Sequence, residues 1–345
     1  MTLHDFMLHD FFFMTSSHMK PWNMNTIKEH AFLLPSSASS CKAVLRLGTH
    51  FHMDTFTAAR FLPLLLLSMS SLLTAQSVMR TVLITGGSRG IGAGLTKAAL
   101  TDPSTFVIAT CRSPSTSNEL QALAKEYNEK KLLILPLDTT SADSYKNVVE
   151  HLKQKGITTI DVLIANAGIT NPEHPADPIL TCSETTMTDV FKTNCVGTML
   201  TLQNFTPLLQ RGSTKLCVLL SSRLASIEQA EGVGGYTSYR ASKAAMNMLA
   251  MTYAEDSTVK EAKIRTLCMH PGWVQTDMGE RGGRKASVTI PDCVNGILSM
   301  ISRASAVQEE QLNPGHKSPN NGDFETKLRA HGCVFTAYDG EMLPW

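Results

Sequence analysis

The chain has 345 residues, of which 43% are apolar, and its 31 basic and 30 acidic side chains leave a formal net charge of +1. This apolar fraction suffices for a packed core, and the balanced charge gives no broad attraction to polyanions, which argues against nucleic-acid binding. The eight cysteines are scattered without a C-x-x-C pair or a cysteine–histidine cluster at zinc spacing, so we expect a reduced, cytoplasmic protein without a metal site.

Residues 1–78 differ from the rest of the chain, because methionine and histidine are frequent and no helical or strand period persists. We expect this extension to lie outside the folded domain. After Arg60, a short apolar stretch ends in small residues at 75–77, which resembles a secretory signal if translation begins at Met53. The stretch is too short and too interrupted for a membrane span. The alternative is a natural start at Met79, which makes the extension dispensable.

Short runs of branched aliphatic residues alternate with longer amphipathic segments from residue 80 onward. The runs lack polar alternation and are separated by helical stretches, a pattern typical of a parallel sheet covered on both faces. We therefore expect an α/β fold, with a doubly wound parallel sheet of the Rossmann type in three layers and one domain over residues 79–345. The strands are expected at 81–86, 105–112, 131–138, 161–168, 215–222 and 264–272, with a last one at 333–340.

Two other segments carry clear local signals. The helix before the strand at 161–168 has Ser141 as its expected N-cap and Gly156 just past its end. The segment 306–331 is polar and rich in turn residues, so we expect most of it to be a surface insertion.

A glycine-rich sequence, TGGSRGIG, connects the first strand to the helix expected at 91–101. Glycines without a Cβ let backbone amides and a helix N-terminus approach a pyrophosphate. The spacing G-x-x-x-G-x-G differs from the G-x-G-x-x-G fingerprint, so a purely structural turn is the alternative. The position of the loop in an alternating series of strands and helices favours dinucleotide binding. The residues expected to line this site are Thr85, Gly86, Ser88, Arg89, Gly90, Ile91 and Gly92.

The end of the second strand indicates which dinucleotide is bound. NAD-binding proteins carry an acidic residue there for the ribose 2′-hydroxyl. Here the strand ends in ATCRS, where Arg112 takes the place in which a 2′-phosphate needs a cation, and Arg89 would add a second positive charge. We therefore expect NADP(H) rather than NAD(H), the alternative being two solvated arginines.

Tyr239 and Lys243, in SYRASKAA, are spaced to project from one face of a helix. A free tyrosine keeps its proton up to a pH of about 10, so it is a poor acid–base catalyst at neutral pH. A nearby ammonium stabilises the phenolate and lowers that pKa. The pair thus predicts a tuned acid, although an isolated pair of this kind is more often a plain surface contact.

The Tyr239/Lys243 pair is one of several motifs that occur along the chain in a defined order. The chain resembles the short-chain dehydrogenase/reductase family, in its single-domain branch, over residues 80–280 and again near residue 345. Its motif sequences are most similar to those of the sniffer/C-factor type of NADPH-dependent carbonyl reductase. The motifs are the glycine loop, LDTT with Asp138, ANAG at 165–168, Asn194 in KTNCVG, Ser222 in LLSSR, the Tyr239/Lys243 pair, HPGWVQTDM at 270–278 and YDGEMLPW at 338–345.

The resemblance implies reduction of an aldehyde or ketone, with Tyr239 as the general acid. Lys243 would lower the tyrosine pKa and hold the nicotinamide ribose, and Ser222 would hydrogen-bond the carbonyl oxygen. Asn194 would hold a water molecule that links Lys243 to solvent. Ser222 matches the family better than Ser221, although it precedes Tyr239 by 17 positions, more than is usual. The implied cofactor contacts elsewhere are Asp138, Asn166, Ala167, Gly168, Tyr239, Lys243, Pro271, Gly272 and Thr276.

Each polar residue of this set also has a local structural alternative, such as capping a turn or helix. For the whole chain the main alternative is an NADP-binding regulatory or sensor protein with little turnover, which would not need the acid. A nucleotide-sugar epimerase or dehydratase fits less well, because that branch has a closer-spaced glycine loop. The resemblance implies a small carbonyl or alcohol substrate and allows a homo-oligomer through the helices that carry Asn194 and Tyr239.

Overall fold

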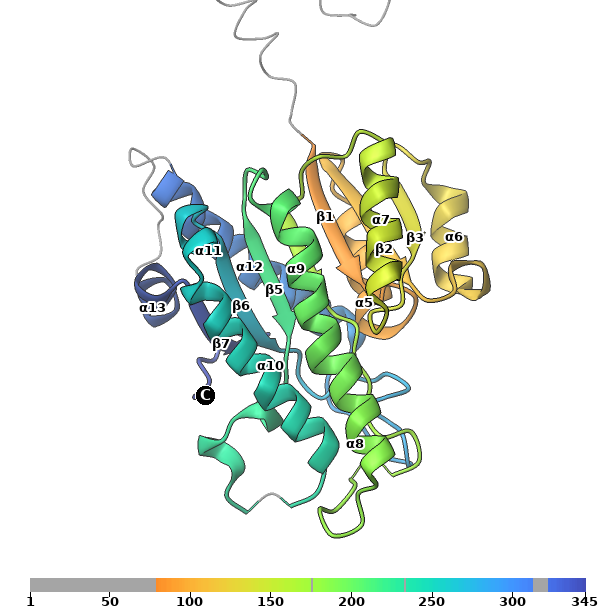
Figure 1. Ribbon diagram of the computed structural model, residues 1–345, viewed down its shortest axis with the longest axis vertical. Helices are drawn as coiled ribbons and strands as arrows, with labels where there is room; N and C mark the ends of the chain where they lie inside the picture. The colour runs from red at the N-terminus through yellow and green to blue at the C-terminus, as the bar shows by residue number, and fades with distance from the viewer. Residues whose placement is uncertain (1–78, 175, 233, 313–321) are drawn as a thin grey trace, which may run out of the picture. The chain divides into compact units, whose positions relative to one another are not determined.

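A seven-stranded parallel sheet forms the middle layer of the chain (Figure 1). The computed structural model describes residues 79–345 except 175, 233 and 313–321, so the expectations for residues 1–78 lie outside the described residues. The strand order is β3-β2-β1-β4-β5-β6-β7. The strands are β1 (Arg80–Thr85), β2 (Thr105–Cys111), β3 (Leu132–Pro136), β4 (Val162–Ala165), β5 (Leu216–Leu220), β6 (Arg265–His270) and β7 (Cys333–Ala337).

All the expected strands are present, and the alternating chain order explains their parallel pairing. The strands are mostly buried, and every residue of β4 and β5 is buried. The strand order reverses between β1 and β4, because β2 and β3 extend the sheet on one side and β4 to β7 on the other. At such a reversal the loops after neighbouring strands diverge and leave room for a ligand at the carboxyl edge of the sheet.

Helices cover both faces of the sheet and complete the three layers. The side chains of α5, α6, α12 and α13 share one buried cluster, and those of α7, α9, α10 and α11 share the other. In Figure 1, α7, α9 and α10 lie in front of the sheet, with α5 and α12 behind it. The helices are α5 (Gly90–Leu100), α6 (Asn118–Glu126), α7 (Ala142–Gln154), α8 (Glu184–Phe191), α9 (Gly197–Leu209), α10 (Thr237–Glu255), α11 (Ser257–Glu261), α12 (Ile290–Leu312) and α13 (Asp323–His331).

The ends of α7 match their sequence signals. Ser141 caps the helix, because its hydroxyl accepts a hydrogen bond from the Ser144 amide at 3.3 Å. Gly156 follows the last turn with a φ of +72°, a conformation that favours glycine. Within the described residues, no helix combines the length and the apolar content needed to cross a bilayer.

The prediction of a surface insertion at 306–331 is wrong for the described part of that segment. Helix α12 runs on to Leu312, and α13 follows from Asp323. Val307, Phe324 and Leu328 are each at most 2% exposed and belong to the main core. The polar composition of the segment concealed apolar residues at helical spacing, which pack both helices onto the sheet.

Four cysteine thiols lie in the two buried clusters that flank the sheet, each at most 3% exposed: Cys217, Cys268, Cys293 and Cys333. Burial raises the pKa of each thiol. An unfolded thiol ionises at a pH of about 8.5. Because the folded pKa is the higher one, the stabilisation is fully present below that pH and is lost as the pH rises above it.

We therefore expect the free energy of unfolding to fall between pH 8 and pH 10, by about 1–2 kcal/mol per thiol. The buried ammonium of Lys243, with a pKa lowered to about 8, acts in the opposite direction by roughly 2 kcal/mol, which four thiols outweigh. Urea unfolding under reducing conditions at both pH values measures the change. Cys217→Ala and Cys333→Ala should each make the fall smaller, and an unchanged stability up to pH 10 would contradict the prediction.

Candidate active site

The glycine loop after β1 leaves no room for a side chain at Gly86 or Gly92. A Cβ on Gly92 would lie 2.1 Å from the Gly86 carbonyl oxygen, and one on Gly86 would lie 2.9 Å from the Ala167 Cα. Helix α5 starts at Gly90 without a side-chain cap and without an acidic residue in its first turn. Its first backbone amides therefore remain available to an anion, and the helix dipole favours one there.

Residues after β4 support this loop from the neighbouring strand. The Thr85 hydroxyl accepts hydrogen bonds from the amides of Asn166 and Ala167, at 3.1 and 3.2 Å. The Asn166 side chain in turn donates to the carbonyls of Thr85 and Gly86, both at 2.9 Å. Four residues expected at a cofactor site thus lie together, and Asn166 holds the shape of the loop.

The remaining loop residues have more ordinary surroundings. The Ser88 carbonyl accepts a hydrogen bond from the Ser117 hydroxyl at 3.0 Å, and Ile91 packs against the core. The exposed guanidinium of Arg89 forms an ion pair with Asp277 at 3.3 Å. This contact joins the glycine loop to the loop after β6.

Arg112 is exposed directly after β2, beside Asp138. The backbone amide of Thr140 is the main cause that lowers the pKa of the Asp138 carboxyl, and the Arg112 charge also contributes. The same carboxylate accepts hydrogen bonds from the Thr140 amide at 2.9 Å and from its hydroxyl at 2.8 Å. Asp138 therefore shapes a turn, and its contact with adenine stays a prediction.

Ser222 and Tyr239 approach each other from β5 and α10. Ser222 follows β5, and its hydroxyl accepts a hydrogen bond from the Leu224 amide at 3.2 Å. Tyr239 lies in the first turn of α10, and the Ser222 hydroxyl acts to lower the pKa of its phenol, against the larger opposite effect of burial. The neighbouring Ser221 hydroxyl is buried and donates to the Asn247 amide oxygen at 2.5 Å. The hydroxyl that faces Tyr239 is thus that of Ser222.

Lys243 lies one turn further along α10, with its Nζ 5.8 Å from the Tyr239 ring centre. The ammonium donates to the Leu220 carbonyl at 2.6 Å, and burial lowers its pKa to about 8. The Tyr239 pKa lies above its usual value rather than below it, because burial raises it more than the Ser222 hydroxyl lowers it. The sequence-based expectation of a lowered tyrosine pKa is wrong for this arrangement, since Lys243 is directed at a backbone carbonyl.

Asn194 sits in a π-helical stretch, Lys192–Val196, that joins α8 to α9. Its buried side chain accepts from the Ile169 amide at 2.8 Å and donates to the Ile169 carbonyl at 2.8 Å and to the Ser242 hydroxyl at 3.0 Å. It also lies next to Gly168, whose Cβ would be 3.2 Å from the Asn194 oxygen and 3.5 Å from the Lys243 Nζ. Short π-helical stretches inside α-helices frequently occur at functional sites.

The loop after β6 closes the site from the other side. Gly272 follows Pro271 with a φ of +86°, and a Cβ there would lie 2.9 Å from the Tyr338 ring. Thr276 accepts a hydrogen bond from the Gly279 amide at 3.1 Å, and its methyl group would lie 3.2 Å from a Cβ on Gly90. The glycine loop and the Pro271–Gly279 loop therefore approach each other closely.

Asp177, which the motifs do not include, is a buried carboxylate that lies against the start of α10. Its Oδ2 accepts from the Ser238 amide at 3.2 Å and from the Cys182 thiol at 3.2 Å. Its carbonyl accepts from the Thr237 amide at 3.1 Å. Asp177 thus caps the helix that carries Tyr239, from a position 60 residues earlier where no local pattern marks a cap.

Comparison with known proteins agrees with this geometry. A short chain dehydrogenase family model matches residues 80–286. Short-chain dehydrogenase RED3 of Pyricularia oryzae is 31% identical over 278 residues, which cover 78% of this chain and 100% of the relative. Two solved structures match 77% of this chain with TM-scores of 0.63: NADPH-bound carbonyl reductase from chicken fatty liver, 30% identical over 99% of its chain, and carbonyl reductase Sniffer of D. melanogaster, 29% identical over 100%. The chain belongs to the short chain dehydrogenase family, as its motifs predicted.

Proposed function

We propose that the protein reduces an aldehyde or ketone to an alcohol with NADPH. The observation that carries the proposal is the convergence of Ser222, Tyr239 and Lys243 at the carboxyl edge of β5. Because burial raises the Tyr239 pKa, the phenol keeps its proton at neutral pH, as a proton donor in reduction must.

Two features of the loops after β1 and β4 support the binding of a dinucleotide phosphate. A Cβ added at Gly86 or Gly92 would collide with neighbouring atoms, so only glycine keeps the backbone in this position. The start of α5 has no side-chain cap, so its first backbone amides can bind a phosphate. Arg112 is exposed at the place where a 2′-phosphate would be read, and the NADPH bound to the chicken carbonyl reductase supports the same preference. When bound, the nicotinamide supplies the hydride.

The protein's own contribution is to hold the carbonyl and supply the proton. Tyr239 donates its phenol proton to the carbonyl oxygen, and Ser222 donates a hydrogen bond to the same oxygen and stabilises the charge that develops there. Lys243 would hold the nicotinamide ribose. Asn194 fixes the loop at Ile169 beside Lys243, and its expected part in a water relay stays a prediction.

Oxidation of NADPH in the presence of aldehydes, ketones and quinones tests this function, with NADH as the comparison. We expect turnover with NADPH to exceed that with NADH. Arg112→Ala should reduce the preference about tenfold, because a charge-assisted contact with the 2′-phosphate is lost. Arg211→Ala is the matched control, since Arg211 is an exposed arginine bonded to the Thr158 carbonyl.

Two outcomes would contradict parts of this proposal. Tight NADPH binding without turnover on any carbonyl would favour the sensor function. An unchanged cofactor preference in Arg112→Ala would show that the second strand does not select the dinucleotide.

A further inference from the structure

The segment Tyr338–Trp345, which we call the strap, contacts two loops of the proposed active site. On one side, the Tyr338 amide donates to the His270 carbonyl at 2.8 Å, and its ring lies against Gly272. On the other side, the strap contacts residues 223–228, which directly follow Ser222. One short segment therefore bridges the loop that carries Ser222 and the loop that the cofactor is expected to contact.

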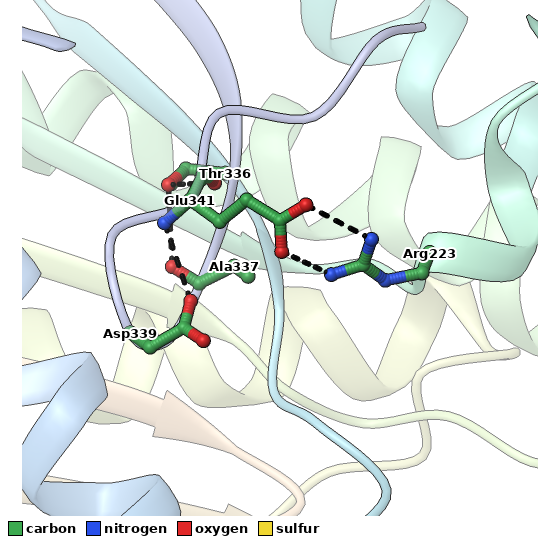
Figure 2. A network of polar contacts seen from close by, with 5 residues as sticks. All are labelled: Arg223, Thr336, Ala337, Asp339 and Glu341. Atoms are coloured by element: carbon green, nitrogen blue, oxygen red, sulfur yellow. Dashed lines mark hydrogen bonds and ion pairs between the residues drawn. The ribbon is translucent and has the colours of Figure 1, made fainter. Parts of the chain in front are cut away.

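The contact nearest to Ser222 is a forked ion pair between Arg223 and Glu341 (Figure 2). Arg223 Nη1 donates to Glu341 Oε1 at 3.1 Å, and Nη2 donates to Oε2. Both side chains are about half exposed, at 40% and 48%, so the pair adds little to overall stability. Two parallel hydrogen bonds nevertheless fix the direction of the guanidinium far better than a single contact would.

The backbone around Glu341 is itself held firmly (Figure 2). The Glu341 carbonyl accepts from the Thr336 hydroxyl and from the Ala337 amide, both at 2.8 Å. The Glu341 amide donates to the Asp339 carboxylate at 3.2 Å. The carboxylate that binds Arg223 therefore extends from a turn anchored to β7.

A second anchor lies further along the strap. The Trp345 carbonyl accepts from the amides of Ile227 and Glu228, at 3.2 and 3.3 Å. The Trp345 ring stacks on Phe335 of β7, with ring centres 5.5 Å apart. This anchor holds the beginning of the long connection between Ser222 and Tyr239.

We propose that Arg223 and Glu341 are positioning residues for the reduction, acting through Ser222. Arg223 opens the 3-10 turn Arg223–Ala225, and the amide of Leu224 in that turn donates to the Ser222 hydroxyl. The direction of this hydroxyl therefore depends on where the turn sits, and the ion pair with Glu341 holds the turn against β7. The proposal rests on the proposed function.

The test compares full-length Glu341→Gln and Arg223→Gln with the wild type in NADPH-dependent carbonyl reduction. We expect kcat and kcat/KM to fall together by about fivefold, because positioning of Ser222 matters in the transition state, while the Kd for NADPH stays unchanged. Exchanging the charges, with Arg223→Glu and Glu341→Arg in one chain, should recover most of the loss. The control is Glu129→Gln, which breaks the exposed Lys155–Glu129 pair at 3.0 Å and should change nothing.

Hydrogen exchange gives a readout that does not depend on turnover. The Ile227 and Glu228 amides should exchange faster in Glu341→Gln than in the wild type, since the strap is loosened. An unchanged kcat in Glu341→Gln, or an equal loss in Glu129→Gln, would overturn the proposal and leave the proposed function standing. Absence of turnover in the wild type would remove both, so the two failures are distinguishable.

Discussion

Replacement of Tyr239 by phenylalanine is expected to lower kcat about 10²–10⁴-fold, the range that a positioned general acid contributes. The substitution removes only the hydroxyl, and the ring still fills its place beside Lys243. The Kd for NADPH should therefore change little. Steady-state turnover together with NADPH fluorescence titration separates the loss of chemistry from a loss of binding.

Tyr236→Phe is the matched control for this change. Tyr236 precedes the first turn of α10, and its hydroxyl accepts a hydrogen bond from Arg284 at 3.1 Å. It has no place in the proposed proton transfer, so its removal should leave most of kcat intact. If Tyr239→Phe kept more than about a tenth of the wild-type rate, the proton would have to come from another group.

The raised Tyr239 pKa also predicts how the two reaction directions depend on pH. Reduction needs the protonated phenol, which persists above the usual value of about 10, so its rate should not fall between pH 6 and pH 9 through this group. Oxidation of an alcohol needs the phenolate, so its rate should rise with pH across the same range. Measuring both directions with the same substrate pair tests the sign of the shift.

The strands and the shared helix face of Tyr239 and Lys243 were predictable because both follow short-range rules. Buried parallel strands are continuous apolar runs, and Tyr239 and Lys243 share a helix face through their spacing alone. The contacts of Asp177 and Glu341 were not predictable, because their partners lie 61 and 118 positions away. The same holds for the direction of the Lys243 ammonium, which is set by the Leu220 carbonyl on another element. A pattern along the chain indicates which residues share a face, but not what the rest of the fold places opposite them.

Gly92→Ala is expected to weaken NADPH binding by more than about 100-fold and to lower the stability of the protein. The new Cβ would lie 2.1 Å from the Gly86 carbonyl oxygen and 2.5 Å from the Asn166 side-chain nitrogen, closer than atoms can approach. The Asn166 nitrogen already donates to that carbonyl, so the loop cannot retreat without breaking the contact. Forcing one extra carbon into such a site costs about 1–3 kcal/mol or more.

The loss of binding should be larger than this loss of stability, because the displaced backbone is the surface proposed to face the phosphates. NADPH titration and thermal unfolding on the same samples compare the two effects. Gly234→Ala is the control, since a Cβ at Gly234 meets no described atom within 4 Å and its φ is not positive. If the Gly92→Ala protein stays folded but no longer binds NADPH, the result would support direct phosphate binding by this loop. If the variant still binds NADPH tightly, the glycines form only a structural turn, which is the alternative that their unusual spacing left open.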